Sequence, residues 1–157
     1  MKTRILQILG VAAIATLGMT SCDTDACKDV DCGANGTCLE GDCICDLGYE
    51  GTNCATLVNA SFTGSFNITE SCTSGPDQYA ITVTAPTATT VNINNLYDAS
   101  LNVTGTINAD GGVTIASQTF GSGTISGSIT ETGGVLTIVY TFTDSSGSPD
   151  TCTMTAS

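Results

Sequence analysis

The sequence contains no histidine and no tryptophan, and only three of its 157 residues are lysine or arginine. Histidine is the side chain that titrates near neutral pH and the commonest metal ligand. Its absence argues against a Ser-His-Asp or Cys-His enzyme and against a zinc site that contains histidine. Apart from Lys28, the chain after its N-terminal segment also has no lysine or arginine that could activate the many serine and threonine hydroxyls. We therefore expect a protein that is not an enzyme, has no catalytic residue and needs no cofactor.

Positive charge is almost absent once the N-terminal segment is set aside. Lys2 and Arg4 lie at the extreme N-terminus, and Lys28 is the third basic residue. Without the N-terminal segment, 15 acidic residues stand against one lysine, a formal charge of 1 − 15 = −14. Such a surface repels nucleic acid and bare anionic lipid. The charge therefore argues against a nucleic-acid partner. It agrees both with plain solubility and with binding of a cation or a basic partner.

The N-terminal segment has the features of an export signal. Lys2 and Arg4 form a short positive region, and a largely apolar run follows from Ile5 to Met19. This run is shorter than the roughly 20 residues that a membrane-spanning helix needs. Small residues then precede Cys22. The pattern predicts a signal peptide over residues 1–21.

The end of that segment, Leu-Gly-Met-Thr-Ser-Cys22, resembles the lipobox of bacterial lipoproteins. Met19 and Thr20 depart from the strictest form, and looser versions are typical of Bacteroidetes-like lipoproteins. The resemblance implies cleavage before Cys22, acylation of Cys22, for example with palmitate, and anchoring in the bacterial outer membrane. Two or three acyl chains hold a membrane firmly, whereas a single chain does not. The alternative is an ordinary cleaved signal with an unrelated cysteine nearby.

The number of cysteines gives a second argument for the anchor. The chain has nine, and an exported protein with an odd number has one thiol with another role. Cys22 stands at the lipidation position, and without it 9 − 1 = 8 cysteines are left, which can all pair. Residues 22–26 then form a short lipidated linker. In it, Asp23 and Asp25 resemble the acidic surface-export signal of Bacteroidetes-like lipoproteins.

Six cysteines between residues 27 and 54 follow the spacing C-x4-C-x5-C-x4-C-x-C-x8-C. A segment shorter than about 40 residues buries too little apolar surface to fold alone. Disulfides must therefore stabilise it, by about 2–4 kcal/mol each. The spacing alone selects none of the possible pairings. Export to an oxidising compartment argues against a zinc cluster.

This segment resembles an EGF-like domain of the tenascin and teneurin type. The likeness covers the six cysteines, the run Asn35-Gly-Thr-Cys38 and the tail C-x-x-G-Y-x-G-x-x-C, which contains Gly48 and Gly51. The resemblance implies a domain over residues 27–54 with three disulfides, Cys27–Cys38, Cys32–Cys43 and Cys45–Cys54. Modules of this kind commonly serve as spacers and as protein-contact surfaces.

A calcium site at this module matches the sequence only in part. Calcium-binding EGF modules carry two acids and a Glu or Gln before the first cysteine. Asp23 and Asp25 match the acids, but Ala26 stands where the Glu or Gln is expected. Asp23 and Asp25 are therefore weak candidates for calcium ligands, and we predict no other metal site.

Residues 56–157 alternate apolar and polar side chains with a period of two, and no segment has a helical period of useful length. Ile, Val, Phe and Tyr favour strands, and Gly, Asn and Asp separate them. The pattern predicts eight strands, over 60–69, 78–85, 89–96, 100–108, 112–119, 123–131, 134–143 and 150–156. Short connections make neighbouring strands antiparallel. We therefore expect a mainly β chain in which an EGF-like module precedes an antiparallel, eight-stranded, up-and-down β-barrel, with a β-sandwich as the alternative.

Cys72 and Cys152 are the two cysteines left over, so we expect them to pair. The first and last strands of a meander barrel are neighbours, and this bond would join them, which favours the barrel. The chain-entropy model gives about 4–5 kcal/mol for so long a loop. The domain is loosely similar to lipocalin-like barrels, and its small interior has room for one small ligand at most. The weak candidates for contacts to such an apolar ligand are Phe66, Tyr79, Tyr140 and Phe142.

Paired carboxylates that could hydrolyse a glycoside are the remaining catalytic option. The acids after residue 56 are Glu70, Asp77, Asp98, Asp110, Glu131, Asp144 and Asp150. Most lie at predicted strand ends or turns, where acids are usually solvated. We therefore expect a non-enzymatic, lipid-anchored, surface-exposed protein that displays the β domain on an EGF-like spacer for adhesion to, or recognition of, a protein or a glycan. The alternatives are a lipocalin-like carrier of a small apolar ligand and an enzyme acting on glycans.

Overall fold

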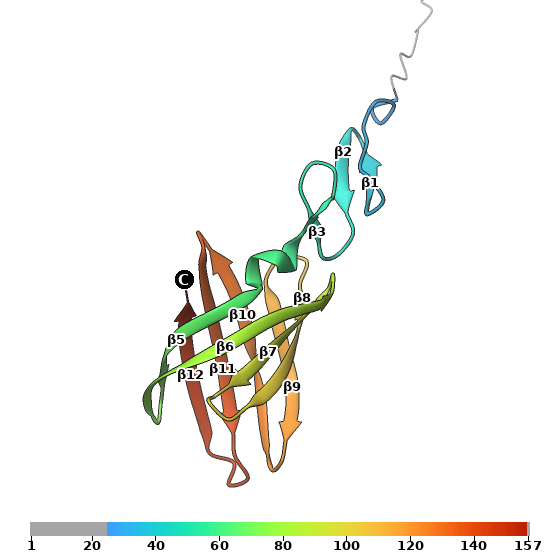
Figure 1. Cartoon of the computed structure of the whole chain (residues 1–157). Helices are drawn as coiled ribbons and strands as arrows, with labels where there is room; N and C mark the ends of the chain where they lie inside the picture. Colours follow the sequence, from blue (N-terminus) through green and yellow to red (C-terminus); the bar gives the residue numbers. More distant parts are fainter. Residues whose placement is uncertain (1–24, 157) are drawn as a thin grey trace, which may run out of the picture.

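A computed structural model describes residues 25–156, so the predicted signal peptide, Cys22 and Asp23 lie outside the described residues. The chain begins with a small module built from two short hairpins (Figure 1). Its strands are β1 (Gly36–Leu39) with β2 (Asp42–Cys45) and β3 (Tyr49–Glu50) with β4 (Thr56–Leu57), each pair antiparallel. No helix in the described part of the chain is long and apolar enough to cross a membrane.

Three disulfides hold this module together. They join Cys27 to Cys38, Cys32 to Cys43 and Cys45 to Cys54. The module has few buried apolar side chains besides its cysteines, and Leu39 and Ile44 are 61% and 56% exposed. The covalent bonds therefore replace the hydrophobic core that so short a segment lacks.

A short 3-10 helix, η1 (Val58–Phe62), connects the module to the second domain. The sequence pattern predicts a strand from residue 60, and this is wrong at its start, because the first barrel strand begins only at Gly64. The Ser61 hydroxyl donates to the Val58 carbonyl and the Thr63 hydroxyl to the Ala60 carbonyl. Such side-chain bonds to nearby backbone compete with strand pairing.

The second domain is a closed barrel of eight antiparallel strands in up-and-down order. The strands are β5 (Gly64–Cys72), β6 (Gly75–Thr87), β7 (Thr90–Leu96), β8 (Leu101–Ile107), β9 (Val113–Phe120), β10 (Gly123–Thr132), β11 (Val135–Thr143) and β12 (Pro149–Ala156). β12 pairs with β5 and closes the barrel. Cys72 and Cys152 lie directly opposite each other in this pairing and form a disulfide. The predicted fold class, an EGF-like module followed by a barrel, is confirmed, and the sandwich alternative is wrong.

Alternating side chains of all eight strands fill the barrel interior. One contiguous cluster of buried residues contains Ile, Val and Leu from β5 to β11, together with Tyr140 and Met154. Phe62 of η1 is 1% exposed and belongs to the same cluster, so η1 covers one end of the barrel. A small eight-stranded barrel filled in this way has a packed core.

The pairing between β8 and β9 is short. Only Thr106 with Thr114 and Ile107 with Val113 are partners, whereas β8 pairs with β7 along most of its length. Beyond those two pairs, the side chain of Gln118 takes the place of a backbone partner. Its Nε2 donates to the Thr104 carbonyl at 2.6 Å, and its Oε1 accepts from the Thr104 amide at 3.0 Å.

The EGF-like module rests on one end of the barrel (Figure 1). The amide of Val58 donates to the Gly48 carbonyl, which ties the loop before β3 to η1. Asn59 is 1% exposed, and its Nδ2 donates at 2.6 Å to the carbonyl of Thr87, the last residue of β6 before the turn to β7. Gly48 touches the same turn, because a Cβ added to it would lie 2.4 Å from the Ala88 carbonyl oxygen. We call this set of contacts the junction.

Candidate functional site

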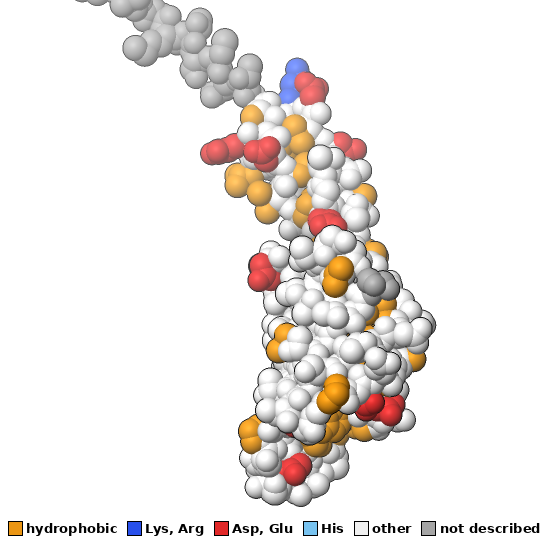
Figure 2. All heavy atoms as spheres, turned by 90° about the vertical axis from the view of Figure 1, so that its left-hand side faces the viewer, with side chains coloured by type: hydrophobic (Ala, Val, Ile, Leu, Met, Phe, Trp, Pro, Cys, Tyr) orange, Lys and Arg blue, Asp and Glu red, His pale blue; other side chains and the backbone are white. Residues whose placement is uncertain are grey.

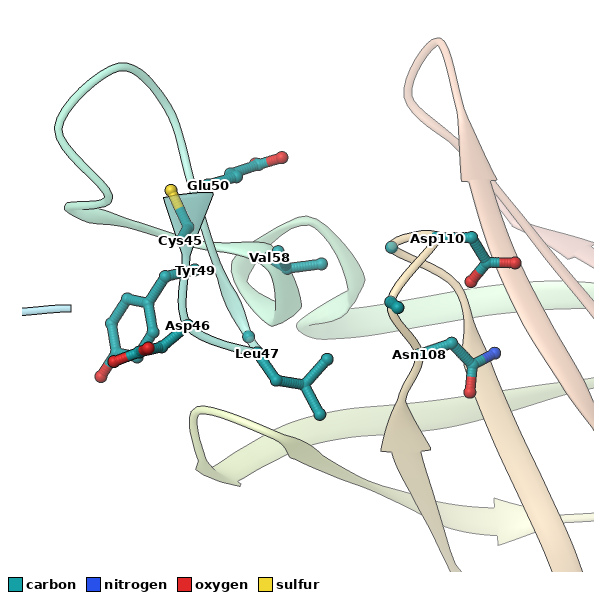
Figure 3. A pocket seen from close by; sticks show the side chains of 11 residues that line it. Cys45, Asp46, Leu47, Tyr49, Glu50, Val58, Asn108 and Asp110 are labelled. Atoms are coloured by element: carbon teal, nitrogen blue, oxygen red, sulfur yellow. The ribbon is translucent and has the colours of Figure 1, made fainter. Parts of the chain in front are cut away.

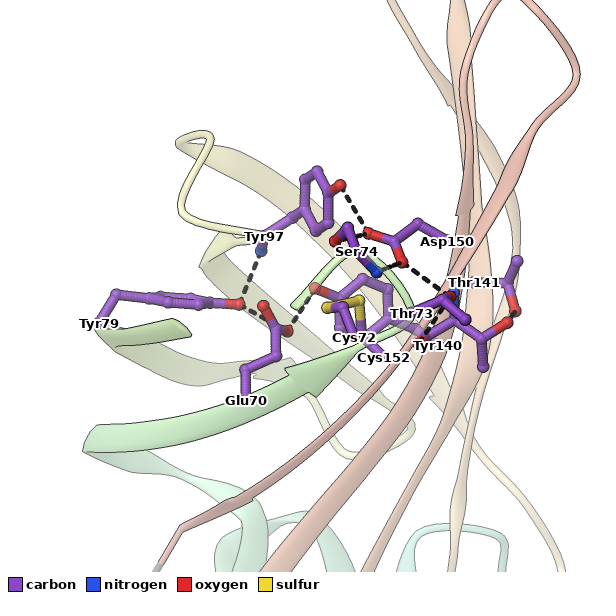
Figure 4. The surroundings of a disulfide bond; sticks show 11 residues. Glu70, Cys72, Thr73, Ser74, Tyr79, Tyr97, Tyr140, Thr141, Asp150 and Cys152 are labelled. Atoms are coloured by element: carbon purple, nitrogen blue, oxygen red, sulfur yellow. Dashed lines mark hydrogen bonds between the residues drawn. A yellow bond between two sulfur atoms is a disulfide. The ribbon is translucent and has the colours of Figure 1, made fainter. Parts of the chain in front are cut away.

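The end of the barrel farthest from the EGF-like module carries a cluster of polar and aromatic side chains (Figures 1 and 4). We call it the distal end. Up-and-down topology brings four connections together there, those between β5 and β6, β7 and β8, β9 and β10, and β11 and β12. The Cys72–Cys152 disulfide fixes the first and last strands at this end.

Glu70 of β5 is the central residue of this cluster and is only 2% exposed. Its Oε1 accepts a hydrogen bond from the Tyr79 hydroxyl at 2.9 Å and another from the Tyr140 hydroxyl. The Tyr79 oxygen in turn accepts from the amide of Tyr97 at 2.9 Å. Figure 4 shows both phenol groups converging on one carboxylate oxygen. A buried carboxylate is tolerated because charged acceptors make strong hydrogen bonds.

Asp150 of β12 ties the neighbouring connections together. Its carboxylate accepts hydrogen bonds from the hydroxyl groups of Thr73, Ser74 and Tyr97 and from the Ser74 amide. These donors favour the charged form, the Ser74 hydroxyl most, and lower the pKa of Asp150 to about 2. Each carboxylate oxygen of Asp150 therefore already accepts two hydrogen bonds from within the chain. These bonds connect β12 to the β5–β6 turn and to the β7–β8 loop.

The tyrosines at the distal end hold their protons more tightly than free phenols. Burial is the largest cause for Tyr79 and Tyr140, and it raises the pKa of each well above the ordinary 10.0. The Asp150 carboxylate is the largest cause for Tyr97, whose pKa is also raised. The ring of Tyr97 stacks on Phe142 at 4.9 Å between centroids and meets Tyr140 edge-on at 6.2 Å.

Two open pockets flank Tyr97 at this end. The first, of about 310 Å³, is lined by Glu70, Cys72, Ser74, Gly75, Pro76, Asp77 and Tyr97, and we call it the Glu70 pocket. The second, of about 370 Å³, lies on the side of Phe142 and Asp150. Pockets of this size suit a small molecule or one side chain of a partner.

A carboxylate oxygen of Glu70 and the sulfur atoms of Cys72 and Cys152 all lie within 4.8 Å of one another. Both sulfurs belong to a disulfide, so neither is the thiolate that binds transition metals. The grouping therefore does not form a thiolate metal site in this structure.

A third pocket, of about 390 Å³, lies at the junction (Figure 3). It is lined by Leu47, Val58 and the neighbouring residues of the EGF-like module and by the β8–β9 connection at Asn108–Gly111. Its acids come from both domains, but in Figure 3 Asp46, Glu50 and Asp110 point in different directions. A calcium ion requires several oxygens at one point, which this arrangement does not provide.

The structure places the weak calcium candidate Asp25 on the surface, where its Oδ1 accepts from the Cys27 amide. Asp23 and the lipidation residue Cys22 lie outside the described residues. Of the four aromatic residues named for a ligand, Tyr79, Tyr140 and Phe142 come together at the distal end. Phe66 does not join them, because its ring packs near Gly64 at the start of β5.

Sequence reasoning missed Glu70, Tyr97 and Asp150 as members of one site, and it treated Glu70 with the solvated acids. Glu70 is instead buried. The period of two could have shown that Glu70 faces inward. Ile68, Glu70 and Cys72 are each two residues apart and therefore lie on one face of β5. No pattern marked Tyr97, which lies in the loop after β7 with a positive φ of 61°.

Comparison with known families assigns the first domain. Residues 27–56 match the teneurin-like EGF domain family, a range that includes the start of β4. The comparison with curated proteins gives no significant match to the chain. The chain therefore contains a teneurin-like EGF domain, stabilised by disulfides, followed by an eight-stranded barrel.

Proposed function

We propose that this is a non-enzymatic, lipid-anchored cell-surface protein that uses the distal end of its barrel for recognition. The observation that carries the proposal is the placement of the EGF-like domain. It lies at one end of the barrel, so the distal end is the part of the barrel farthest from residue 25 (Figure 1). A protein tethered at its N-terminus would present that end outward.

The EGF-like domain serves as the spacer. Three disulfides stiffen it, and the junction fixes it to the barrel through Gly48, Val58 and Asn59. Disulfides of this kind persist in oxidising compartments outside the cytoplasm. The tether is Cys22, which carries two or three acyl chains and holds the protein in a bacterial outer membrane.

Recognition is a better match to the barrel than the carrying of an apolar ligand. A carrier needs a hollow interior, whereas the buried side chains of this barrel form one packed cluster. The distal pockets are lined largely by polar residues, with carboxylates and hydroxyl groups among them. These side chains suit a polar ligand or a protein or glycan partner that lies across the barrel end.

The test is expression of the full chain in a bacterium that processes lipoproteins, with labelled palmitate in the medium. We expect label on the wild-type protein and none on Cys22→Ser. We also expect intact cells to bind an antibody raised against the β5–β6 and β11–β12 turns. Label that persists in Cys22→Ser would refute the anchor. A lipidated protein whose distal end reacts only after cell lysis would refute surface display.

A further inference from the structure

We propose that the Glu70 pocket binds a small organic cation with N–H donors, that is, a primary ammonium group on a ligand or on a partner's side chain. This deepens the proposed function and rests on it only in taking the distal end as the recognition surface.

One of the two carboxylate oxygens of Glu70, Oε2, accepts no hydrogen bond from the residues that the structure describes. Both hydrogen bonds to its carboxylate, from Tyr79 and Tyr140, go to Oε1. No residue in the range 25–156 donates to Oε2, and Figure 4 shows this oxygen directed away from Tyr140, with no bond drawn to it. Glu70 is 98% buried, since its exposed fraction is 2%, yet it lines the pocket. Among the described residues no buried side-chain oxygen or nitrogen lacks a partner, so Oε2 is accessible from the pocket and can accept a hydrogen bond from a donor that enters it.

Asp77 brings a second negative charge to the same pocket. It is the register partner of Glu70 across the β5–β6 pair, so the two side chains leave the sheet on the same face. Both residues line the pocket, Glu70 at its bottom and Asp77 exposed at its rim. Like charges directly opposite each other destabilise a strand pair. A cation between them removes that repulsion.

Within the part of the chain that the structure describes, no basic side chain lies at the distal end. The sequence has no lysine, arginine or histidine after Lys28, which belongs to the EGF-like domain. On the face shown in Figure 2, the positive side chain lies at the far tip of that domain, whereas acidic side chains occur along both domains. Residues 25–156 therefore offer no counter-charge beside Glu70 and Asp77, and a cation that enters the pocket from outside can supply it.

The chemistry of the walls favours an ammonium group over a metal ion. A calcium ion takes six to eight oxygen ligands, whereas Glu70 and Asp77 are the two carboxylates among the residues that line this pocket. An ammonium group needs only a few acceptors, and its N–H groups can bond to Oε2 while Asp77 neutralises its charge. Pro76 and the ring of Tyr97 provide carbon surface for an attached alkyl chain.

The experiment is an NMR titration of the full processed chain, in mild detergent, with n-butylammonium chloride. Parallel titrations use n-butanol, which has the same length without the charge, and calcium chloride. We expect butylammonium to shift the amide signals of residues 70–75, 77 and 97 saturably. Butanol should bind at least about 10-fold more weakly, because its hydroxyl can donate to Glu70 but it has no positive charge to attract Glu70 and Asp77.

Variants locate the binding site. Glu70→Gln keeps the shape and removes the charge, and we expect about 10-fold weaker binding or more. Asp77→Asn is at the exposed rim, does not disturb the core, and should weaken binding about 2- to 5-fold. Asp46→Asn makes the same change in net charge in the EGF-like domain and should leave binding unchanged. If Glu70→Gln does not fold, the other two variants still test the site, because Asp77→Asn should weaken butylammonium binding and Asp46→Asn should not.

Several results would overturn the inference. They are equal binding of butanol and butylammonium, distal shifts with calcium alone, no saturable shift with any probe, and equal effects of Asp77→Asn and Asp46→Asn. None of these bears on the proposed display, which the antibody and palmitate experiments measure separately. Conversely, a barrel that binds butylammonium but is not exposed on cells would refute the display and leave the ligand chemistry intact.

Discussion

At the scale of single residues, the distal end places the carboxylate of Glu70 and the phenols of Tyr79 and Tyr140 beside the mostly aliphatic side chains of the barrel interior. Glu70 lies in the same inward-facing row as Ile68. The two tyrosine hydroxyls bond to the carboxylate instead of to water. Because the three groups depend on one another, a change of charge on any of them should be felt as a change in stability.

The first prediction concerns alkaline pH. The pKa values of Tyr79 and Tyr140 in the folded protein lie above the ordinary 10.0, chiefly because both side chains are buried. A raised pKa in the folded state gives stability that is complete below the unfolded value and is lost as the pH rises through the folded value. We therefore expect the free energy of unfolding to fall as the pH rises above about 10.

The measurement is an ultraviolet titration of phenolate together with denaturant unfolding at each pH. In the folded protein we expect Tyr79 and Tyr140 to stay protonated near pH 11, where a free phenol is about nine-tenths ionised. The double variant Tyr79→Phe, Tyr140→Phe should lose this late phase and most of the alkaline loss of stability. Ionisation of all the tyrosines near pH 10 in a protein that is still folded would contradict the burial argument.

At the scale of strands, β8 and β9 are joined by two backbone register pairs and, beyond them, by the side chain of Gln118. Gln118 makes two hydrogen bonds to the amide and carbonyl of Thr104, the same two groups that a neighbouring strand would use. Without Gln118 this part of β8 would present an unpaired edge, which is a site for unwanted association. The amide side chain therefore acts as a local substitute for a strand.

We predict that Gln118→Ala destabilises the protein by about 1–3 kcal/mol, because two hydrogen bonds of about 0.5–1.5 kcal/mol each are lost. The amide hydrogen of Thr104 should exchange much faster, while those of the β5–β12 pair keep their protection. Denaturant unfolding and hydrogen exchange measure the two effects. Thr119→Ala, an exposed position on the same strand, is the matched control. Unchanged exchange at Thr104 would mean that Gln118 does not close this edge.

The regular strand pairing could be predicted from the sequence, whereas the hydrogen bonds of Gln118 could not. The alternation of apolar and polar residues predicts all eight barrel strands, because burial of one face is a local pattern of period two. Cys72 follows the first predicted strand and Cys152 lies in the last one, and their expected pairing favours a closed barrel, which the structure confirms. The bonds made by Asn59 and Gln118 were not predictable, since they join residues whose neighbours are set only by the folded barrel.

Glu70 is the instructive residue at the candidate site. Its parity on β5 places it inside, but the predicted strand ends at residue 69, so Glu70 was grouped with the acids at strand ends, which are usually solvated. The deciding fact is that Tyr79 of β6 and Tyr140 of β11 supply donors, and their convergence depends on the strand register. η1 was missed for a different reason, since a single helical turn is too short to show a period.

At the scale of the whole molecule, the two domains form an extended shape in which the EGF-like domain continues the direction of the barrel (Figure 1). A spacer is useful only if its orientation is fixed, and the junction is where that orientation is set. Gly48 is the tightest point, because its φ is +92° and an added Cβ would lie 2.4 Å from the Ala88 carbonyl oxygen. Any side chain there must push the EGF-like loop away from the β6–β7 turn.

We therefore predict that Gly48→Ala loosens the junction and leaves both domains folded, because three disulfides hold the first and a closed core the second. Small-angle X-ray scattering should give a broader distribution of overall dimensions, and NMR relaxation should show the domains tumbling more independently. Gly51→Ala is the matched control. Its φ is +89°, so the backbone penalty is similar, but its added Cβ would meet only Thr56 within the EGF-like module, at 3.4 Å. Equal loosening in both variants would mean that strain within the EGF-like loop, and not its contact with Ala88, sets the orientation of the spacer.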